Sequence, residues 1–200
     1  MRARDVMSTP VVTITPQTPV KAAAETLAAR GFTALPVVDE DGWLLGVVTE
    51  ADLVRDRFPR DARSSPAGGD ARPAAGALVG DVMTAPAEAV GVRLDVVDVV
   101  RLMLDQHLRS LPVVDGDRVV GIVSRRDLVR TLARSDEALA RDIRHRLAIF
   151  GGPGRWSVDV AGGEVTITDR FGSETDRHVA TVLAESVPGV LRARCVRAAQ

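Results

Sequence analysis

Apolar and polar residues alternate along the first part of the chain in a pattern that predicts the same five elements twice. In the first copy they are a strand, a helix, two strands joined by a turn, and a second helix, at residues 11–14, 18–30, 34–38, 44–49 and 50–57. Thr18-Pro19 suits the start of the first helix, as a hydroxyl N-cap followed by proline, and Gly31 suits its end. This β-α-β-β-α order predicts an α/β (α+β) fold, a small mixed sheet with helices on one face.

The second copy repeats this order with a longer helix at residues 95–107. Apolar residues recur along this helix at helical spacing, so we expect all of them in the core: Val96, Val99, Val100, Met103 and Leu104.

The two copies also match residue by residue, which identifies a tandem repeat. At an offset of 76 residues, Asp5-Val6-Met7 returns as Asp81-Val82-Met83, and Leu35-Pro36-Val37-Val38-Asp39 returns as Leu111-Pro112-Val113-Val114-Asp115. The offset falls to 75 after a predicted hairpin turn, where one residue is lost. A length change confined to a turn is what duplicated structure tolerates.

The most informative repeated motif is Gly-x-x-(Thr/Ser)-x-x-Asp. In each copy, two β-branched residues suit a buried strand and the hydroxyl residue suits the N-cap of the following helix. The aspartate falls in the first helical turn, where the helix dipole favours negative charge. These groups could bind a phosphorylated sugar, or they could form a helix capping box and nothing more. Recurrence in register favours a binding site with four polar residues: Thr49, Asp52, Ser124 and Asp127.

Composition narrows the possible functions. The 200 residues carry a formal net charge of −1 and few aromatic side chains, so nothing indicates attraction to nucleic acid or broadly to an anionic membrane. Cys195 is the only cysteine, which rules out a disulfide within the chain and fits a reducing compartment. No apolar run is long enough to cross a membrane, and no signal core follows the N-terminus. We therefore expect a soluble, cytoplasmic protein.

Catalysis has no support in the sequence. His107, His145 and His178 fall in predicted helices, without the cysteine or carboxylate spacing of a metal site or a catalytic triad. No glycine-rich phosphate loop follows a predicted strand. We predict that the protein is not an enzyme, with no catalytic residue, no metal site and no required cofactor.

Two further segments differ from the repeats. Residues 58–77 are rich in proline, glycine and charged residues, which predicts a flexible linker. Residues 136–198 predict a separate αββαβ domain, with a hairpin turn at Gly162-Gly163 between its first two strands. Phe171 continues the alternation of Val165 and Ile167, so we expect it in the core of that domain.

The doubled unit resembles the CBS domain, and the pair resembles a Bateman module. The resemblance rests on the Asp-Val-Met and Leu-Pro-Val-Val-Asp segments and on both glycine-to-aspartate motifs, and it covers residues 1–57 and 78–134. It implies a pseudo-symmetric pair with two clefts for adenosine-containing ligands, namely AMP, ADP, ATP, S-adenosylmethionine or NAD. Such an adenine nucleotide would be a regulatory ligand. The resemblance also implies a homodimer through the CBS pairs, which exposed apolar helix faces would support.

Site residues can be carried over from this resemblance one by one. Asp52 and Asp127 would hold ribose hydroxyls, while Thr49 and Ser124 would lie beside the ribose or phosphate. Val11 and Val12 would wall the adenine of one cleft, whereas repeat two has Glu88 in place of Val12, which would disfavour an adenine face.

The resemblance further implies that the two clefts are unequal. The family often places a basic residue two positions before Leu-Pro, where repeat one has Thr33 and repeat two has Arg109. This residue can serve the cleft whose ribose aspartate comes from the other repeat, or it can be a solvated arginine at a helix end. Arg125 and Arg126 crowd the second motif. We expect the combination of Asp52 and Arg109 to form the better nucleotide site.

Residues 136–198 resemble a BON domain, a family associated with contact to phospholipid or membrane surfaces. The resemblance rests on Ile143 and Leu147 of the helix, on the strand Gly163-Glu164-Val165-Thr166-Ile167 and on Val187-Pro188-Gly189-Val190, whereas Asp169 replaces a glycine often found after that strand. A phospholipid or protein partner is therefore possible, although the segment carries no net positive charge that would attract anionic lipid.

Two functions remain open at this stage. In the first, the CBS pair senses an adenosine-containing ligand and relays its state to the BON-like domain or to a partner. In the second, the pair is an unliganded dimerisation scaffold that presents the BON-like domain. Four polar residues at matching strand-to-helix corners favour sensing, because a scaffold has little reason to retain them.

Overall fold

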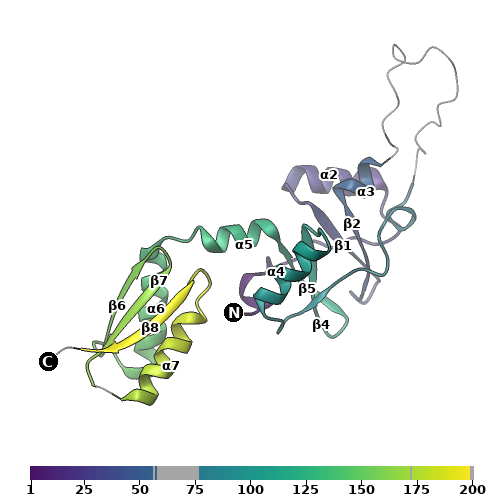
Figure 1. Ribbon diagram of the computed structural model, residues 1–200. Coiled ribbons are helices and arrows are strands. Elements are labelled where there is room, and N and C mark those ends of the chain that lie inside the picture. Colours follow the sequence, from purple (N-terminus) through teal and green to yellow (C-terminus); the bar gives the residue numbers. More distant parts are fainter. Residues whose placement is uncertain (56, 58–76, 172, 199–200) are drawn as a thin grey trace, which may run out of the picture. The chain divides into compact units, whose positions relative to one another are not determined.

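The computed structural model describes residues 1–55, 57, 77–171 and 173–198. They form two compact units, one of Met7–Ser124 and one of Met1–Val6 with Arg125–Gln200. Figure 1 labels their helices and strands. Of the linker predicted at residues 58–77, all but Ala77 lies outside the described residues. In the described part of the chain, no helix combines the length and the apolar character needed to cross a membrane.

The unit Met7–Ser124 holds the strands of both repeats and has the mixed α/β architecture predicted from the sequence. Repeat one contributes helix α2 (Val20–Arg30), antiparallel strands β1 (Ala34–Val38) and β2 (Leu44–Thr49), and the short helix α3 (Glu50–Val54). Repeat two contributes the 3-10 turn η1 (Val79–Asp81), helix α4 (Val96–Asp105) and strands β3 (Val90–Gly91), β4 (Ser110–Asp115) and β5 (Arg118–Ser124). Strand β4 pairs in parallel with β3 and antiparallel with β5, which confirms the fold class.

The beginning of repeat one differs from the prediction. Ile14 pairs with Val37 as a single bridge, so the strand predicted at residues 11–14 was wrong as a continuous element. The N-cap of helix α2 is Pro19, one residue after Thr18, which the sequence pattern predicted as the N-cap. The hydroxyl of Thr18 instead accepts a hydrogen bond from the backbone N–H of Thr15, at 3.2 Å, and so closes a turn ahead of the helix.

Helix α4 buries a narrower stripe than the sequence pattern predicted. Val96, Val99 and Met103 are buried, and Val100 is half-buried. Leu104 is 56% exposed, so its assignment to the core was wrong. The buried positions follow i, i+3 and i+7, and Leu104 lies past the edge of that stripe.

The N-terminal segment of each repeat packs on the other repeat. Residues 77–84 pack on repeat one, where Val79 is fully buried in a core otherwise made from repeat-one side chains: Val20, Ala23, Leu27, Leu35, Val37, Val48 and Leu53. Val47 and Thr84 exchange two backbone hydrogen bonds, at 3.0 and 2.9 Å. Ser8 and Ile122 exchange two more, at 2.8 and 3.2 Å. Each repeat therefore supplies part of the other's packing.

Two glycines permit this exchange. A Cβ atom on Gly46 would lie 2.9 Å from the sulfur of Met83, and a Cβ atom on Gly121 would lie 2.5 Å from the sulfur of Met7. Both distances are too short for a real side chain. The repeated Asp-Val-Met segment and the repeated glycine motif are therefore contact partners, crossed between the two repeats.

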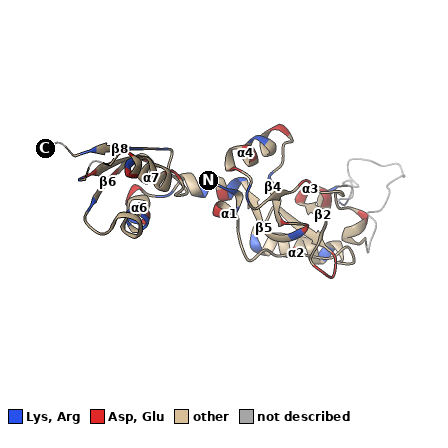
Figure 2. Cartoon of the chain, turned by 90° about the horizontal axis from the view of Figure 1, so that it is seen from below, with Lys and Arg blue, Asp and Glu red and all other residues tan. Residues whose placement is uncertain are grey.

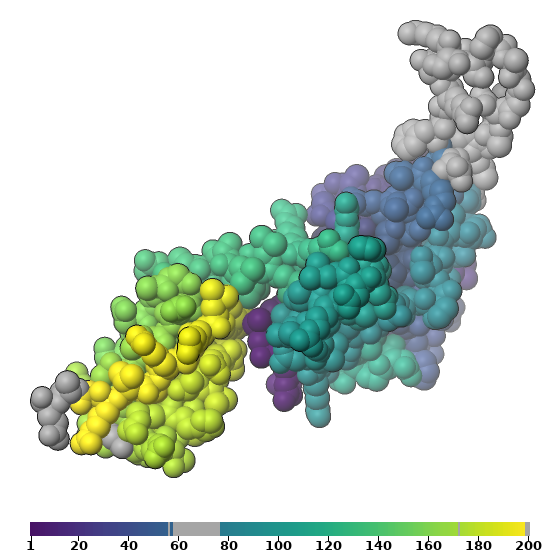
Figure 3. Space-filling view, viewed as in Figure 1, coloured from purple at the N-terminus to yellow at the C-terminus, as the bar shows by residue number. Residues whose placement is uncertain are grey.

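The second unit is built on two helices and a three-stranded sheet. The sheet order is β6-β7-β8, with β6 (Trp156–Ala161) antiparallel and β8 (Arg192–Arg197) parallel to β7 (Glu164–Asp169). Helices α6 (Asp136–Gly151) and α7 (Glu174–Glu185) contact each other, and α7 lies beside β8 (Figures 1 and 3). One core joins them to the sheet and includes the predicted stripe of α6: Leu139, Ile143 and Leu147. Helices α1 (Ala3–Val6) and α5 (Arg125–Leu132) also belong to this unit and contact each other.

Asp169, not Phe171, occupies the last core position of β7. Val165, Ile167 and Asp169 are all buried, whereas Phe171 is 75% exposed, so placing Phe171 in the core was wrong. Arg155 compensates the buried charge, because its Nε and Nη2 donate to the two carboxylate oxygens of Asp169 at 2.9 and 3.2 Å. The backbone N–H of Phe171 donates to the same carboxylate at 3.0 Å, which turns the chain out of the sheet.

Arg155 is itself held on several sides. Its guanidinium pairs with Asp176 of α7 at 2.7 Å and lies over the ring of Trp156, 4.2 Å from the ring centre. The carboxylates of Asp169 and Asp176 hold the pKa of Arg155 above its usual value, chiefly through the hydrogen bonds that Arg155 donates to Asp169, so this guanidinium stays charged. A charge-paired arginine thus closes one end of the second unit's core.

Candidate ligand cleft

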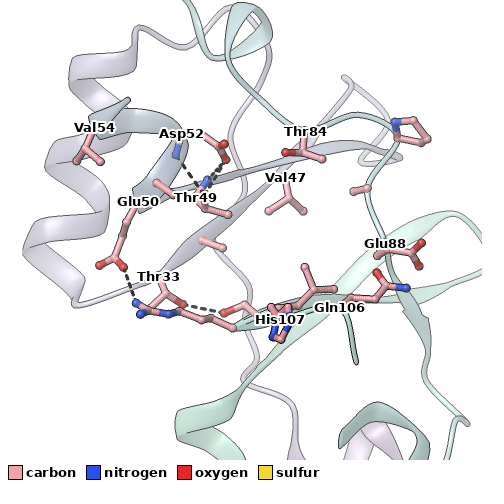
Figure 4. A pocket seen from close by; sticks show the side chains of 17 residues that line it. Thr33, Val47, Thr49, Glu50, Asp52, Val54, Thr84, Glu88, Gln106 and His107 are labelled. Atoms are coloured by element: carbon pink, nitrogen blue, oxygen red, sulfur yellow. Dashed lines mark hydrogen bonds and ion pairs between the residues drawn. The ribbon is translucent and has the colours of Figure 1, made fainter. Parts of the chain in front are cut away.

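A cavity of about 700 Å³ lies within the unit Met7–Ser124 and takes its walls from both repeats. Its volume is in the range of small-molecule sites. Apolar side chains form much of the lining: Ala34, Val47, Val54, Pro86, Ala87 and Leu108. Polar and charged side chains of the lining are Thr33, Thr49, Glu50, Asp52, Thr84, Glu88, Gln106, His107, Arg109 and Ser110. Figure 4 shows Val47 between Thr84 on one side and His107 on the other.

Thr49 and Asp52 form a capping box at the start of α3. The backbone N–H and the hydroxyl of Thr49 donate to Oδ2 of Asp52 at 2.9 and 2.7 Å, and the backbone N–H of Asp52 reaches the Thr49 hydroxyl at 3.3 Å. In the described part of the chain, Oδ1 of Asp52 has no hydrogen-bond partner. The motif therefore caps the helix with one of its two carboxylate oxygens.

Arg109 of repeat two lines the same cleft as Asp52, the combination that the resemblance to CBS domains implied. Its Nη1 lies 3.6 Å from Oε2 of Glu50, and the two side chains are 73% and 51% exposed. The hydroxyls of Thr33 and Ser110 lie 2.8 Å apart and join the two repeats, a contact drawn as a dashed line from Thr33 in Figure 4. The exposed ion pair is a weak contact that solvent screens, so a ligand can compete for either partner.

Glu88 lies in the same cleft as Asp52 and Arg109. Figure 4 places it across the cavity from Glu50. From the resemblance, we expected Glu88 to disfavour an adenine face and Asp52 with Arg109 to form the better nucleotide site. The acidic side chain in fact falls in that preferred cleft, because residues 84–88 of repeat two follow the segment that packs on repeat one.

The other predicted site residues do not line this cavity. Val12 packs against the core of repeat one, and Val11 is half-buried. Ser124 ends β5 in one unit, while Arg125 and Arg126 are exposed at the start of α5 in the other.

Asp127 lies in the first turn of α5 and is buried at 9% exposure. Its Oδ1 is 3.4 Å from Nη1 of Arg130, so a neighbouring cation faces the carboxylate. The two motif aspartates therefore differ in their surroundings, since Asp52 lines an open cavity and Asp127 is buried beside an arginine.

His107 and Glu50 are cleft residues that sequence reasoning did not select. His107 has a φ of 56°, a left-handed conformation that turns the chain sharply between α4 and β4. The sequence placed His107 near the end of a predicted helix and gave no sign that it lines a cleft. Glu50 follows the N-cap threonine directly, and only the placement of Arg109 from the other repeat shows that it faces the cavity.

The geometry agrees with a known family. The protein-family model for the CBS domain matches residues 3–57 and 79–134, which together exceed half of the chain. This chain belongs to the CBS domain family. It carries two CBS domains in tandem, which confirms the predicted CBS pair.

Other CBS proteins show what such pairs hold. The chain is 32% identical over 134 residues to the CBS domain-containing protein CBSX2 of Arabidopsis thaliana, covering 58% of this chain and 56% of that protein. A crystal structure of CBSX2 in complex with AMP is 31% identical, with a TM-score of 0.52, and the match covers 64% of this chain and 93% of that chain. The CBS domain pair of protein MJ0100, solved with 5′-methylthioadenosine and S-adenosylmethionine, is 27% identical with a TM-score of 0.53 over 65% of this chain and 94% of that chain.

The chain covers only part of several curated relatives, spanning between 27% and 57% of the lengths of four that it matches. Two solved CBS pairs, by contrast, are matched over 94% and 93% of their own length. The part of this chain that the CBS family model matches is the two repeats.

Proposed function

We propose that this protein is a non-enzymatic sensor that binds an adenosine-containing ligand in the cleft lined by Thr49, Asp52 and Arg109. One observation carries the proposal: Asp52 of repeat one and Arg109 of repeat two line a single cavity, and the hydrogen bonds from Thr49 go to Oδ2 of Asp52. A ribose presents paired hydroxyls, which a carboxylate oxygen accepts strongly. The apolar walls around Val47 and Pro86 suit an adenine ring. The adenosine compounds found in the CBS pairs of MJ0100 and in CBSX2 support this chemistry.

The response to the ligand follows from the crossed packing of the repeats. Because the cleft is walled by both repeats, a bound ligand would tie α3 of repeat one to the α4–β4 turn of repeat two. Ligand shifts a conformational equilibrium only by its difference in affinity for the two states. We propose that residues 136–198, which resemble a BON domain, or a partner bound to them, receive that shift.

Thermal-shift titration of the full chain with AMP, ADP, ATP, NAD and S-adenosylmethionine tests the sensor proposal. A ligand at 100 times its dissociation constant should stabilise the native state by about 2.7 kcal/mol. Asp52→Asn should weaken binding about tenfold to a hundredfold, since a hydrogen bond to a charged acceptor contributes about 1.5–3 kcal/mol. Asn retains an acceptor for the Thr49 backbone, so the helix cap largely survives.

Asp81→Asn is the matched control. Asp81 accepts a hydrogen bond from the backbone N–H of Leu78, three residues earlier, at 2.9 Å, and it does not line the cleft. Asp81 therefore makes the same kind of capping hydrogen bond as Asp52, but at a position that does not line the cavity. If both variants lost ligand binding, the cause would be loss of a cap and not loss of a ligand contact, which would contradict the proposed role of Asp52.

A scaffold function is the second candidate, and the capping box favours it. Because Thr49 and Asp52 satisfy each other at the start of α3, their presence has a structural reason without any ligand. Helix α4 also exposes Val97 and Leu104, at 57% and 56%, which suits a homodimer contact. A folded, dimeric protein that binds none of the five adenosine compounds would support the scaffold. Binding of the full chain to phospholipid vesicles would then test the BON-like domain as its working part.

A further inference from the structure

The charge of the cleft selects among adenosine compounds. We propose, resting on the sensor function above, that the Asp52 cleft prefers an adenosine whose 5′ substituent is neutral or positively charged, such as 5′-methylthioadenosine or S-adenosylmethionine, over adenosine phosphates. Two features of the cleft support this preference: the charges that line the cavity and the carboxylate that already pairs with Arg109.

Carboxylates outnumber cations in the lining. Glu50, Asp52 and Glu88 face the cavity, whereas Arg109 is the single arginine or lysine among the lining residues of the described chain. Helix α3 accordingly begins with acidic residues in Figure 2. Protonation of His107 would add one positive charge at most and would still not neutralise all the carboxylates.

The one guanidinium is already engaged. Arg109 Nη1 lies 3.6 Å from Oε2 of Glu50, so a phosphate that approached Arg109 would compete with this carboxylate. If the phosphate displaced Glu50, the cavity would hold the freed carboxylate, Asp52, Glu88 and the incoming anion. A phosphate monoester carries about two negative charges at neutral pH because its second pKa is about 6. Each added phosphate therefore raises the repulsion within the cleft.

A sulfonium or thioether avoids this repulsion. The sulfonium of S-adenosylmethionine is a fixed cation, and carboxylates such as Glu88 or Glu50 attract it. The thioether of 5′-methylthioadenosine is neutral, so the carboxylates do not repel it, and the lining offers apolar side chains as well as charged ones. The Asp52 carboxylate can accept ribose hydroxyls from either compound, since both retain an unmodified ribose.

Calorimetric titration of the full chain with four compounds tests this preference. We expect 5′-methylthioadenosine and S-adenosylmethionine to bind at least tenfold more tightly than AMP, with ATP weaker than AMP. Added salt should tighten AMP binding, since it screens repulsion between exposed charges, and should leave 5′-methylthioadenosine unchanged within twofold. A cleft that attracted phosphate would show the opposite salt dependence.

Two variants and one control locate the effect. Glu88→Gln and Glu50→Gln should each strengthen AMP binding by about threefold to tenfold, because each removes a negative charge that AMP must face. Both should change 5′-methylthioadenosine binding by less than twofold. Glu40→Gln, at an exposed turn outside the cleft, should change neither.

The outcomes separate this inference from the sensor function. AMP or ATP binding as tightly as 5′-methylthioadenosine, with affinity lost in Asp52→Asn, would overturn the ligand preference and keep the sensor. Failure of all four compounds to bind the folded protein would overturn both.

Discussion

Replacement of Gly46 by alanine tests the crossed packing of the two repeats. The new Cβ atom would lie 2.8 Å from the backbone carbonyl oxygen of Thr84 and 2.9 Å from the sulfur of Met83. The methionine can swing away, but the carbonyl cannot move alone. Thr84 exchanges two backbone hydrogen bonds with Val47, the residue next to Gly46. Relief of the clash therefore requires the two segments to separate.

The expected change in the free energy of unfolding follows from two contributions. Overpacking in a tightly packed site costs about 1–3 kcal/mol, and a clash with fixed backbone belongs at the upper end of that range. Replacing glycine in a strand returns about 0.5–1 kcal/mol, because alanine loses less conformational freedom on folding. We therefore expect Gly46→Ala to lower the free energy of unfolding by about 2 kcal/mol.

Gly121→Ala is the matched comparison on the other repeat. There the three atoms nearest to the new Cβ all belong to the side chain of Met7, at 2.5 to 3.3 Å. A flexible side chain can adapt, so the cost should fall near the lower end of the overpacking range, about 1 kcal/mol, and the gain from replacing glycine should largely offset it. Net destabilisation should stay below about 0.5 kcal/mol.

Urea unfolding followed by far-ultraviolet circular dichroism measures both variants and two double mutants. Met7→Ala should abolish the cost of Gly121→Ala, because the clashing side chain is gone. Met83→Ala should not rescue Gly46→Ala, because the Thr84 carbonyl remains. Equal costs for the two glycine variants, or full rescue by Met83→Ala, would refute the contact with the backbone that the structure describes.

Two further predictions concern the second unit. Asp169→Asn should lower the melting temperature of the second unit by more than about 5 °C, because the fully buried carboxylate accepts three hydrogen bonds, two of them from Arg155. Asp159→Asn, at an exposed position of a strand, is the control and should shift the melting temperature by less than about 1 °C. The hydrogen bond from Arg134 lowers the pKa of Asp142, so its contribution to stability is present above the ordinary carboxyl pKa of about 3.9 and is lost as pH falls through the lowered value. Asp142→Asn should therefore flatten the acid side of a plot of melting temperature against pH, and an unchanged plot would contradict the assignment.

Local sequence patterns predicted the hairpin strands of repeat one. They failed where a residue far away in the sequence determines which side chain is buried. The bounds of β1 and β2 match the prediction, because alternation and a turn of Asp and Gly are local signals. The end of β7 differs from the prediction. Asp169 can be buried there because Arg155, fourteen residues earlier in the chain, pairs with its carboxylate. Alternation of apolar residues predicted Phe171 in the core and gave no sign that the Asp169 carboxylate would be buried there, paired with Arg155.

In the cleft too, local sequence predicted some features, whereas others depend on long-range contacts. The glycine-to-aspartate motif indicated a strand-to-helix corner at Thr49 and Asp52, and the corner is there. Which cavity Glu88 enters depends on how residues 77–84 cross to repeat one, a long-range contact with no local signature. The family resemblance brought Asp52 and Arg109 together, and the charge around them required the structure.

The exchange of segments between the repeats makes each repeat incomplete by itself. A lone repeat would leave its glycine strand uncovered and its methionine without the contact that it makes in this chain. Two repeats complete each other's packing, because the leading segment of each covers the glycine of the other. We therefore expect the smallest unit that folds to be a pair of repeats rather than a single repeat.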